Sequence, residues 1–439
     1  MIFRGRKILI HNTHKDTVMF RKNPVLPARI LVYVLAISVV IATIIGALIS
    51  LKSIRQAQYE LFSQNIDLYN NTKSGVELLL DADTSALRKT SHDLYENETD
   101  TVTISKRFWG VYALGTLDVH KNTIQGKISN NKSMLLGGDL LEEQQAAIYL
   151  AGRNNELNIG GTTKIIGDAY LPIGGIKTAM INGVNYRGNR LIYDGKKKQS
   201  KRFLPPRNQL LIDTIKNYFK PIVSNSNVES LSQPNSFLQP TKIISGQDVY
   251  LNNLSLKGNI IVKADSTVVI TANNQIEDII VIATNIIVES GFRGNLQLFA
   301  KRTITIQSNV ELNYPSAIVL FKEDGMQITK QPIIEIGERS LVEGVIWLEE
   351  LKINRTKGIV IIKEKALIHG QVICNGFVDV KGAIYGNVSC TGFFLKTAAS
   401  VYENHLFNTV IDATKLNPYF VNHIIFDKTS SNQIIKWLE

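Results

Sequence analysis

The chain has 439 residues, 44% of them hydrophobic, so it can form two or three ordinary domains or one elongated repeat domain, and it is too apolar to be disordered. Its two cysteines exclude a disulfide scaffold, and no Cys-x-x-Cys pair or Cys/His cluster with zinc spacing suggests a structural metal. Because the net charge of +11 is concentrated at two places in the sequence, we expect no nucleic-acid partner.

The first concentration of charge precedes a hydrophobic segment. Residues 1–29 hold seven Lys and Arg against one Asp, and residues 30–51 then contain no charge. At ~1.5 Å of rise per residue this second segment covers the ~30 Å core of a bilayer. A cleaved signal peptide is the rival interpretation, but the apolar run is longer than a signal peptide needs and no Ala-x-Ala site follows.

We therefore predict a single-pass protein of a bacterial inner (cytoplasmic) membrane, with residues 30–51 in the lipid bilayer. The positive-inside rule puts residues 1–29 in the cytoplasm as a basic segment. The bulk of the chain is then periplasmic or extracellular.

The helical pattern continues beyond the hydrophobic segment. Ile54, Leu61 and Leu68 recur every seven residues, so we assign residues 52–90 to an extracytoplasmic helix that packs one face on another part, followed by a linker. The arrangement over residues 25–80 resembles the pilin-like and pseudopilin-like components of bacterial secretion and pilus machines. That resemblance implies a place in an assembled envelope machine.

Short β-branched runs broken by Gly and Asn follow, and each is typical of a strand of four to seven residues. Equivalent phrases recur at sixteen to twenty residues, as in Ile286 and Ile304 at eighteen, which suits a coil of three short strands. The predicted fold is mainly β, a transmembrane helix followed by a right-handed β-solenoid with a helical insertion. We assign 91–207 to a first β-solenoid-like tract, 208–240 to a helical insertion and polar loop, 241–401 to a second β-solenoid tract, and 402–439 to a C-terminal cap or tail.

The clearest repeat pairs GQVICNGF, from Gly370, with GNVSCTGF, from Gly386. Strand alternation then points Val372, Cys374, Val378, Val380 and Ile384 inward, and Asn375, Asp379, Lys381 and Tyr385 outward. The two glycines occupy corners, and Cys374 stacks on Cys390 in the next coil. A disulfide is conceivable there, but stacked parallel side chains favour buried free thiols.

The last predicted coils, over residues 340–401, resemble the bactofilins, a family of polymer-forming proteins. The resemblance implies a small right-handed β-helix with Gly-x-Val-type turns.

The second concentration of charge is the basic cluster Arg187–Arg207, with eight Lys and Arg against Asp194. It is either a solvated loop or a docking patch for an anionic glycan, a lipid head group or an acidic partner. The chain has no nucleotide-binding glycine loop and no Gly-x-Ser-x-Gly elbow. A polysaccharide-acting solenoid would need carboxylates converging on one face, and the candidates are Glu349, Glu350, Glu364 and Asp379, with Lys381.

From these patterns we predict no catalytic, cofactor-binding or metal-binding residue, and we expect that the protein is not an enzyme. The sequence favours a structural or assembly component of a bacterial envelope, secretion or pilus-like machine, with envelope proteins or further copies as partners. The alternative is a membrane-tethered β-helix that binds or cleaves carbohydrate.

Overall fold

The computed structural model describes residues 28–81, 89–96, 99–123, 126–152, 156–221, 234–322, 331–350, 357–398, 400–427 and 432–438. The predicted cytoplasmic segment 1–29 lies almost wholly outside this part of the chain, so its location stays a prediction. The chain divides into two compact units, residues 1–67 and residues 68–439.

The N-terminal unit is formed by most of helix α1, which spans Ala28–Asp81. It is the one helix among the described residues that is long and apolar enough to cross a membrane. The side chains of residues 30–51 are exposed throughout, as expected for a segment that needs an apolar surrounding such as lipid. The predicted membrane helix and extracytoplasmic helix are therefore one continuous element.

The second unit begins with an antiparallel sheet in the order β1-β2-β3-β4-β27. Its strands are β1 (Lys89–Asp93), β2 (Asp100–Trp109), β3 (Tyr112–Thr123), β4 (Gly126–Gly138) and the C-terminal β27 (Asn432–Leu438). Consecutive strands β1 to β4 pair antiparallel with their chain neighbours. The prediction of a solenoid-like tract from residue 91 is therefore wrong for residues 91–138, because solenoid coils pair in parallel.

The last turns of α1, from Leu68 to Asp81, pack on one face of this sheet. Leu68 and Leu79 are buried in the same hydrophobic cluster as Val102 and Leu117 of the sheet. Close approach depends on glycine, because a Cβ at Gly75 would meet the side chains of Leu117 and Val102. The prediction that the helix lays one face on another part of the chain is thus confirmed from Leu68 onward.

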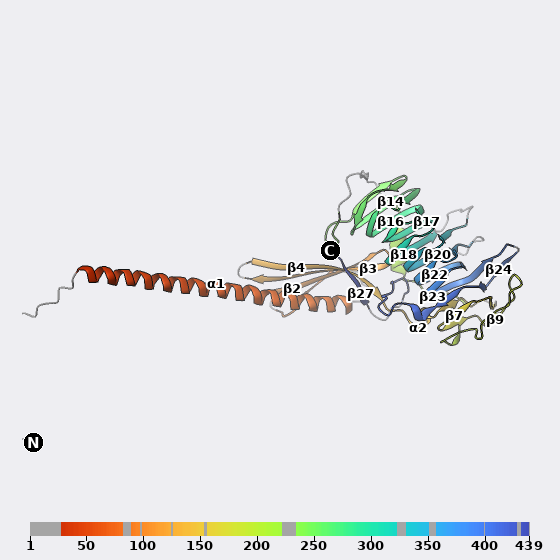
Figure 1. The fold of residues 1–439 in the computed structure, drawn as a ribbon, viewed down its shortest axis with the longest axis horizontal. Helices are drawn as coiled ribbons and strands as arrows, with labels where there is room; N and C mark the ends of the chain where they lie inside the picture. Colours follow the sequence, from red (N-terminus) through yellow and green to blue (C-terminus); the bar gives the residue numbers. More distant parts are fainter. Residues whose placement is uncertain are drawn as a thin grey trace, which may run out of the picture. The chain divides into compact units, whose positions relative to one another are not determined.

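The rest of the unit is mainly a parallel β-solenoid with three strand faces per coil. Its strands are β11 (Lys242–Gly246), β12 (Val249–Leu251), β13 (Ser255–Lys257), β14 (Ile260–Ala264), β15 (Thr267–Ile270), β16 (Gln275–Val288), β17 (Arg293–Ile306), β18 (Glu311–Lys322), β19 (Ile333–Ile336), β20 (Leu341–Glu350), β21 (Ile359–Ile362), β22 (Leu367–Val380), β23 (Ala383–Lys396) and β26 (Val410–Asp412). Figure 1 shows these strands following one another along the stack from β14 to β23. The predicted offset of eighteen residues is confirmed by the pairing of Ile286 with Ile304.

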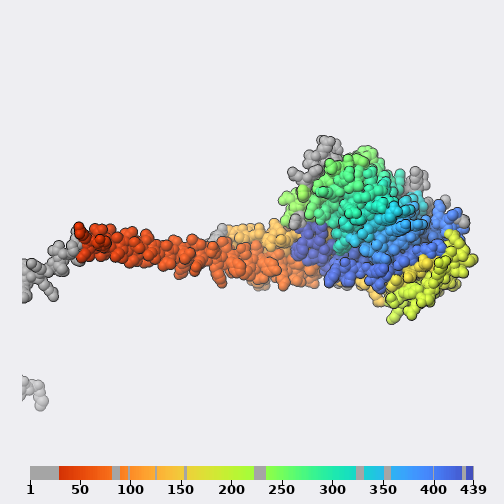
Figure 2. Space-filling model, in the orientation of Figure 1, coloured from red at the N-terminus to blue at the C-terminus, as the bar shows by residue number. Residues whose placement is uncertain are grey.

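Four strands of the first tract continue the same stack beyond β23, namely β5 (Ile148–Leu150), β7 (Lys164–Ile166), β8 (Ala169–Leu171) and β10 (Lys197–Gln199). β5 pairs in parallel with β23, and β7 pairs in parallel with β26. In Figure 2 the yellow residues of this tract accordingly lie against the blue C-terminal coils. The two predicted tracts are therefore one solenoid, in which residues 148–199 stack on the end of residues 242–412.

The smaller elements are α2 (Glu142–Gln145), α3 (Gln209–Tyr218), a 3-10 turn (Ala413–Lys415), β24 (Val401–Glu403), and a three-stranded sheet of β6 (Leu157–Gly160), β9 (Ile176–Thr178) and β25 (His405–Phe407). Helix α3 falls inside the predicted insertion 208–240, and the Asn208 side chain caps it by accepting hydrogen bonds from the amides of Leu210 and Leu211. Residues 222–233 of the predicted polar loop lie outside the described residues.

The repeated phrase is stacked as predicted. Gly370 pairs with Gly386 and Cys374 with Cys390 in adjacent strands β22 and β23, and both cysteines are buried free thiols. The five predicted inward residues all belong to the hydrophobic core inside the coils. Of the predicted outward residues, Asp379 is nevertheless buried, being 5% exposed.

A second hydrophobic cluster covers the outside of one solenoid face. Apolar side chains alternate outward along this face, including Ile282, Phe299, Phe321, Trp347 and Ile373, and they are buried against α3, the antiparallel sheet and residues 424–426. The strands of this face thus carry apolar side chains on both their inner and their outer surface. The outer side chains pack the solenoid against the sheet.

Candidate functional site

The helix surface between the membrane segment and the sheet is the first candidate for an interaction site. Ile54, Tyr59, Leu61, Phe62 and Ile66 are all exposed, at 56%, 73%, 49%, 64% and 44% of their surface. Ile54 and Leu61 belong to the predicted seven-residue pattern. Its third member, Leu68, is buried. The apolar side chains between residues 54 and 66 therefore form an exposed stripe on the helix. Such a surface is of the kind that marks a contact with another molecule.

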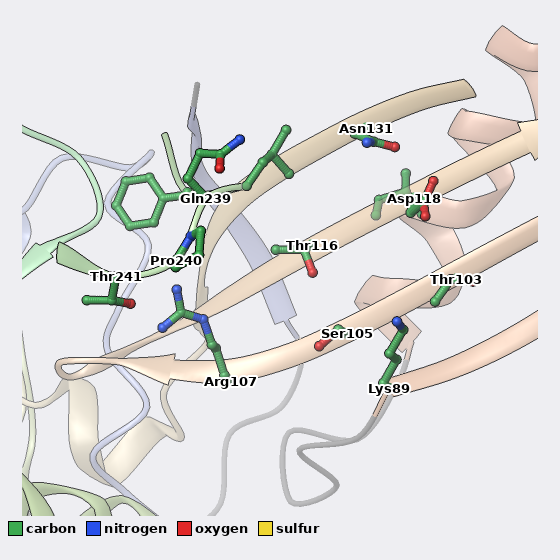
Figure 3. Close-up of a pocket in the computed structure, with 13 residues that line it drawn as sticks. Lys89, Thr103, Ser105, Arg107, Thr116, Asp118, Asn131, Gln239, Pro240 and Thr241 are labelled. Atoms are coloured by element: carbon green, nitrogen blue, oxygen red, sulfur yellow. The ribbon is translucent and has the colours of Figure 1, made fainter. Parts of the chain in front are cut away.

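A second candidate is a groove of about 530 Å³ on the face of the antiparallel sheet that α1 leaves free. Figure 3 shows hydroxyl, amide and charged side chains spread along β1 to β4, with Arg107 beside residues 239–241. The residues that line it are Lys89, Thr103, Ser105, Arg107, Thr116, Leu117, Asp118, Asn131, Phe237, Leu238, Gln239, Pro240 and Thr241. Asp118 is the one carboxylate among them, so this groove lacks the carboxylate pair that glycoside cleavage needs.

Two cations line this groove, Lys89 and Arg107, and Arg107 is held by its surroundings. Its guanidinium donates to Asn259 Oδ1 at 3.4 Å and lies 5.4 Å from the centre of the Trp109 ring. Burial lowers the pKa of Arg107 from its ordinary value, although an arginine stays protonated at neutral pH. The groove can therefore offer one fixed positive charge, that of Arg107, beside hydrogen-bonding groups, Lys89 and the carboxylate of Asp118.

The predicted basic cluster Arg187–Arg207 divides into two parts. Lys198 pairs with Asp168 at 2.8 Å, Lys201 pairs with Glu143 at 3.1 Å, and Arg207 pairs with Glu349 at 3.0 Å. The remaining five basic residues, Arg187, Arg190, Lys196, Lys197 and Arg202, are exposed, and none forms an ion pair with another described residue. Only this second part is available to a ligand.

The ion pair between Arg207 and Glu349 is structural, because both side chains are only 8% exposed. The Glu349 carboxylate also accepts hydrogen bonds from Trp347 Nε1 at 3.0 Å and from Asn375 Nδ2 at 2.9 Å. Sequence reasoning missed this role of Arg207, since its partner is 142 residues away and no local pattern signals it.

The carboxylates considered for carbohydrate cleavage do not converge on an open face. Glu349 is neutralised by its arginine, and Glu350 is buried with a raised pKa, chiefly because burial disfavours its charge. Burial likewise raises the pKa of Asp379, whereas Glu364 is exposed at a corner. Within the described ranges no three His, Cys, Asp or Glu side chains are grouped as metal ligands would be.

Another pair of acidic side chains lies beside the C-terminal strand. Lys436 of β27 reaches Glu277 at 3.0 Å and Asp278 at 2.7 Å, both on β16. The arrangement fastens the antiparallel sheet to the solenoid, and it leaves both carboxylates engaged by a cation.

Comparison with known proteins gives little further information. No protein-family model matches the chain, and no curated protein matches it. One solved structure is similar, the competence-associated pilin ComZ from Thermus thermophilus, at 9% sequence identity and a TM-score of 0.18, over 82% of this chain and 86% of that one. A TM-score this low carries no argument about fold or activity, so the pilin-like and bactofilin-like resemblances remain at the level of the sequence.

Proposed function

We propose that this protein is a membrane-anchored, non-catalytic assembly component that presents its β-solenoid outside the cytoplasm. The observation that carries the proposal is the exposed apolar stripe on residues 54–66, directly beyond the segment that fits a bilayer. Burying such large apolar side chains stabilises association by ~25 cal/mol per Å² removed from water.

The proposed occupant of the stripe is the same helix of a second copy. Membrane anchoring places residues 54–66 of every copy at the same height above the bilayer and in the same direction. The seven-residue spacing of Ile54 and Leu61 is the spacing of packed helices, and the shared anchoring makes the two helices parallel. The solenoid and the sheet would then be carried side by side in an assembly of such helices.

Cysteine cross-linking in membranes tests this contact. Leu61→Cys should give a disulfide-linked dimer on mild oxidation, because the two native cysteines are buried and the new thiol is the reactive one. Glu60→Cys is a matched control, since Glu60 is also exposed but lies on the side of the helix opposite the middle of the stripe. Equal cross-linking at both positions, or none at position 61, would refute the proposed contact.

The orientation needs its own measurement. Protease added outside spheroplasts should digest the bulk of the chain while a tag at Met1 stays protected, because the basic residues precede the hydrophobic segment. Protection of the solenoid and loss of the tag would mean that the protein faces the other way.

A further inference from the structure

A second groove, of about 490 Å³, lies at the corners of the last solenoid coils. It is lined by Asn182, Glu364, Lys365, Lys381, Leu395, Lys396, Thr397, Phe407 and Asn408. Lys365 precedes β22, Lys381 separates β22 from β23, and Lys396 ends β23, so three consecutive coils each contribute one lysine. Because coils repeat every ~4.8 Å, the groove carries a row of positive charges along the solenoid axis.

These three lysines are free to meet a ligand. None of them forms an ion pair within the described part of the chain, whereas the neighbouring Lys363 is engaged by Glu335 at 3.2 Å. Glu364 is the one carboxylate among the lining residues, so the groove keeps a positive balance. A row of unpaired cations repels itself unless a partner of opposite charge is present.

The groove is also adjacent to the exposed cations of the basic cluster. The Arg187 backbone amide donates a hydrogen bond to the Gly161 carbonyl at 2.8 Å. Thr162, which follows Gly161 in the chain, donates its backbone amide to Asn408 Oδ1 at 3.0 Å. Asn408 lines the groove, so the cluster begins at its rim. Arg187 and Arg190 are both exposed.

We propose that this groove binds an acidic polysaccharide. A row of cations across three coils suits a polymer with repeated carboxylates better than a single small anion. The amides of Asn182 and Asn408 and the hydroxyl of Thr397 are the partners that sugar hydroxyls use. Single-stranded nucleic acid is disfavoured because it is held on rows of aromatic side chains, and Phe407 is the one aromatic residue among those lining the groove.

Binding to the purified full-length chain in detergent micelles tests the assignment, with polygalacturonate as the probe at ~0.15 M ionic strength. The variant carrying Lys365→Gln, Lys381→Gln and Lys396→Gln should bind roughly tenfold or more weakly, because three charge-assisted contacts are lost. The matched control carries Lys73→Gln, Lys127→Gln and Lys132→Gln, which removes three exposed lysines around the antiparallel sheet. We expect the control to bind like the unaltered chain.

Uncharged dextran should not bind, and binding of polygalacturonate should weaken as salt is added. No binding by the unaltered chain, an equal loss in both triple variants, or duplex DNA binding as tightly as polygalacturonate would each overturn the proposal. The measurement uses isolated protein, so it is independent of the orientation and helix association proposed above.

Discussion

Replacing Gly370 by alanine should loosen the stack of coils locally. Gly344, Gly370 and Gly386 pair across three successive coils and have φ values of 144°, 149° and 145°. An alanine in this region is strained by ~1–3 kcal/mol. Its Cβ would also overlap the carbonyl oxygen of Gly344, which the backbone can relieve only by parting the coils, at a further ~1–3 kcal/mol. The expected destabilisation is therefore about 2–6 kcal/mol.

Gly126 offers a control that separates the two contributions. Its φ is 131°, and a Cβ built there meets no atom within 4 Å. Gly126→Ala should therefore cost only the backbone strain of ~1–3 kcal/mol. The difference between the two variants measures the contact between coils.

Hydrogen exchange of the full chain, followed by mass spectrometry, is the appropriate assay because it reports opening region by region. A loss of ~4 kcal/mol corresponds to roughly a thousandfold faster exchange through opening. Since a coil contacts only its neighbours, the faster exchange should be confined to about residues 340–401. Equal effects of Gly370→Ala and Gly126→Ala, or a uniform change along the chain, would refute the reasoning.

Three further outcomes are expected. Cys374 and Cys390 should react slowly with thiol reagents in the native protein and fast after denaturation, because burial excludes the reagent and raises the pKa of both thiols; rapid native labelling would contradict the stacking. Burial and the nearby Arg207 charge lower the pKa of His423 to about 3, so stability should fall as the pH drops from ~6.5 toward 3, by up to ~1.4 kcal/mol per pH unit. His423→Gln should flatten this dependence in denaturation curves, and substitution of the exposed His92 should leave it unchanged. Lys436→Met should speed hydrogen exchange in β27 while exchange in β22 stays the same, because it removes the ion pairs to β16.

The solenoid could be predicted because its repeat relates residues that are close together in the sequence. Offsets of sixteen and eighteen residues place Gly386 over Gly370 and Ile304 over Ile286, and these registers depend only on the residues of adjacent coils. The antiparallel sheet was missed because its strands have the same β-branched composition as the coils. A short turn such as that between β2 and β3 was the available signal, since parallel strands need a longer connection.

The outer hydrophobic cluster is visible in the sequence, but a search for alternating apolar and polar residues does not detect it. Runs such as DIIVIA, SAIVLF and GVIWL are apolar at successive positions, which indicates strands buried on both surfaces. What covers them could not be predicted, because helix α3 and β27 reach this face from distant parts of the chain. The lysine groove was likewise hidden, since Lys365, Lys381 and Lys396 become neighbours only once the coils are stacked.

The order in which the coils are stacked has a consequence for biosynthesis. Residues 148–199 leave the ribosome first, yet the surfaces on which they stack belong to β23 and β26, which end at residues 396 and 412. At a translation rate of ~5–20 residues per second, roughly ten to fifty seconds pass between the synthesis of these early coils and that of β23 and β26. During that interval their strand edges are open to other chains, and a ribosome that stops before β23 leaves them without a native partner. If the chain crosses a membrane as it is made, a chaperone on the far side would have to hold residues 148–199 until the last coils arrive.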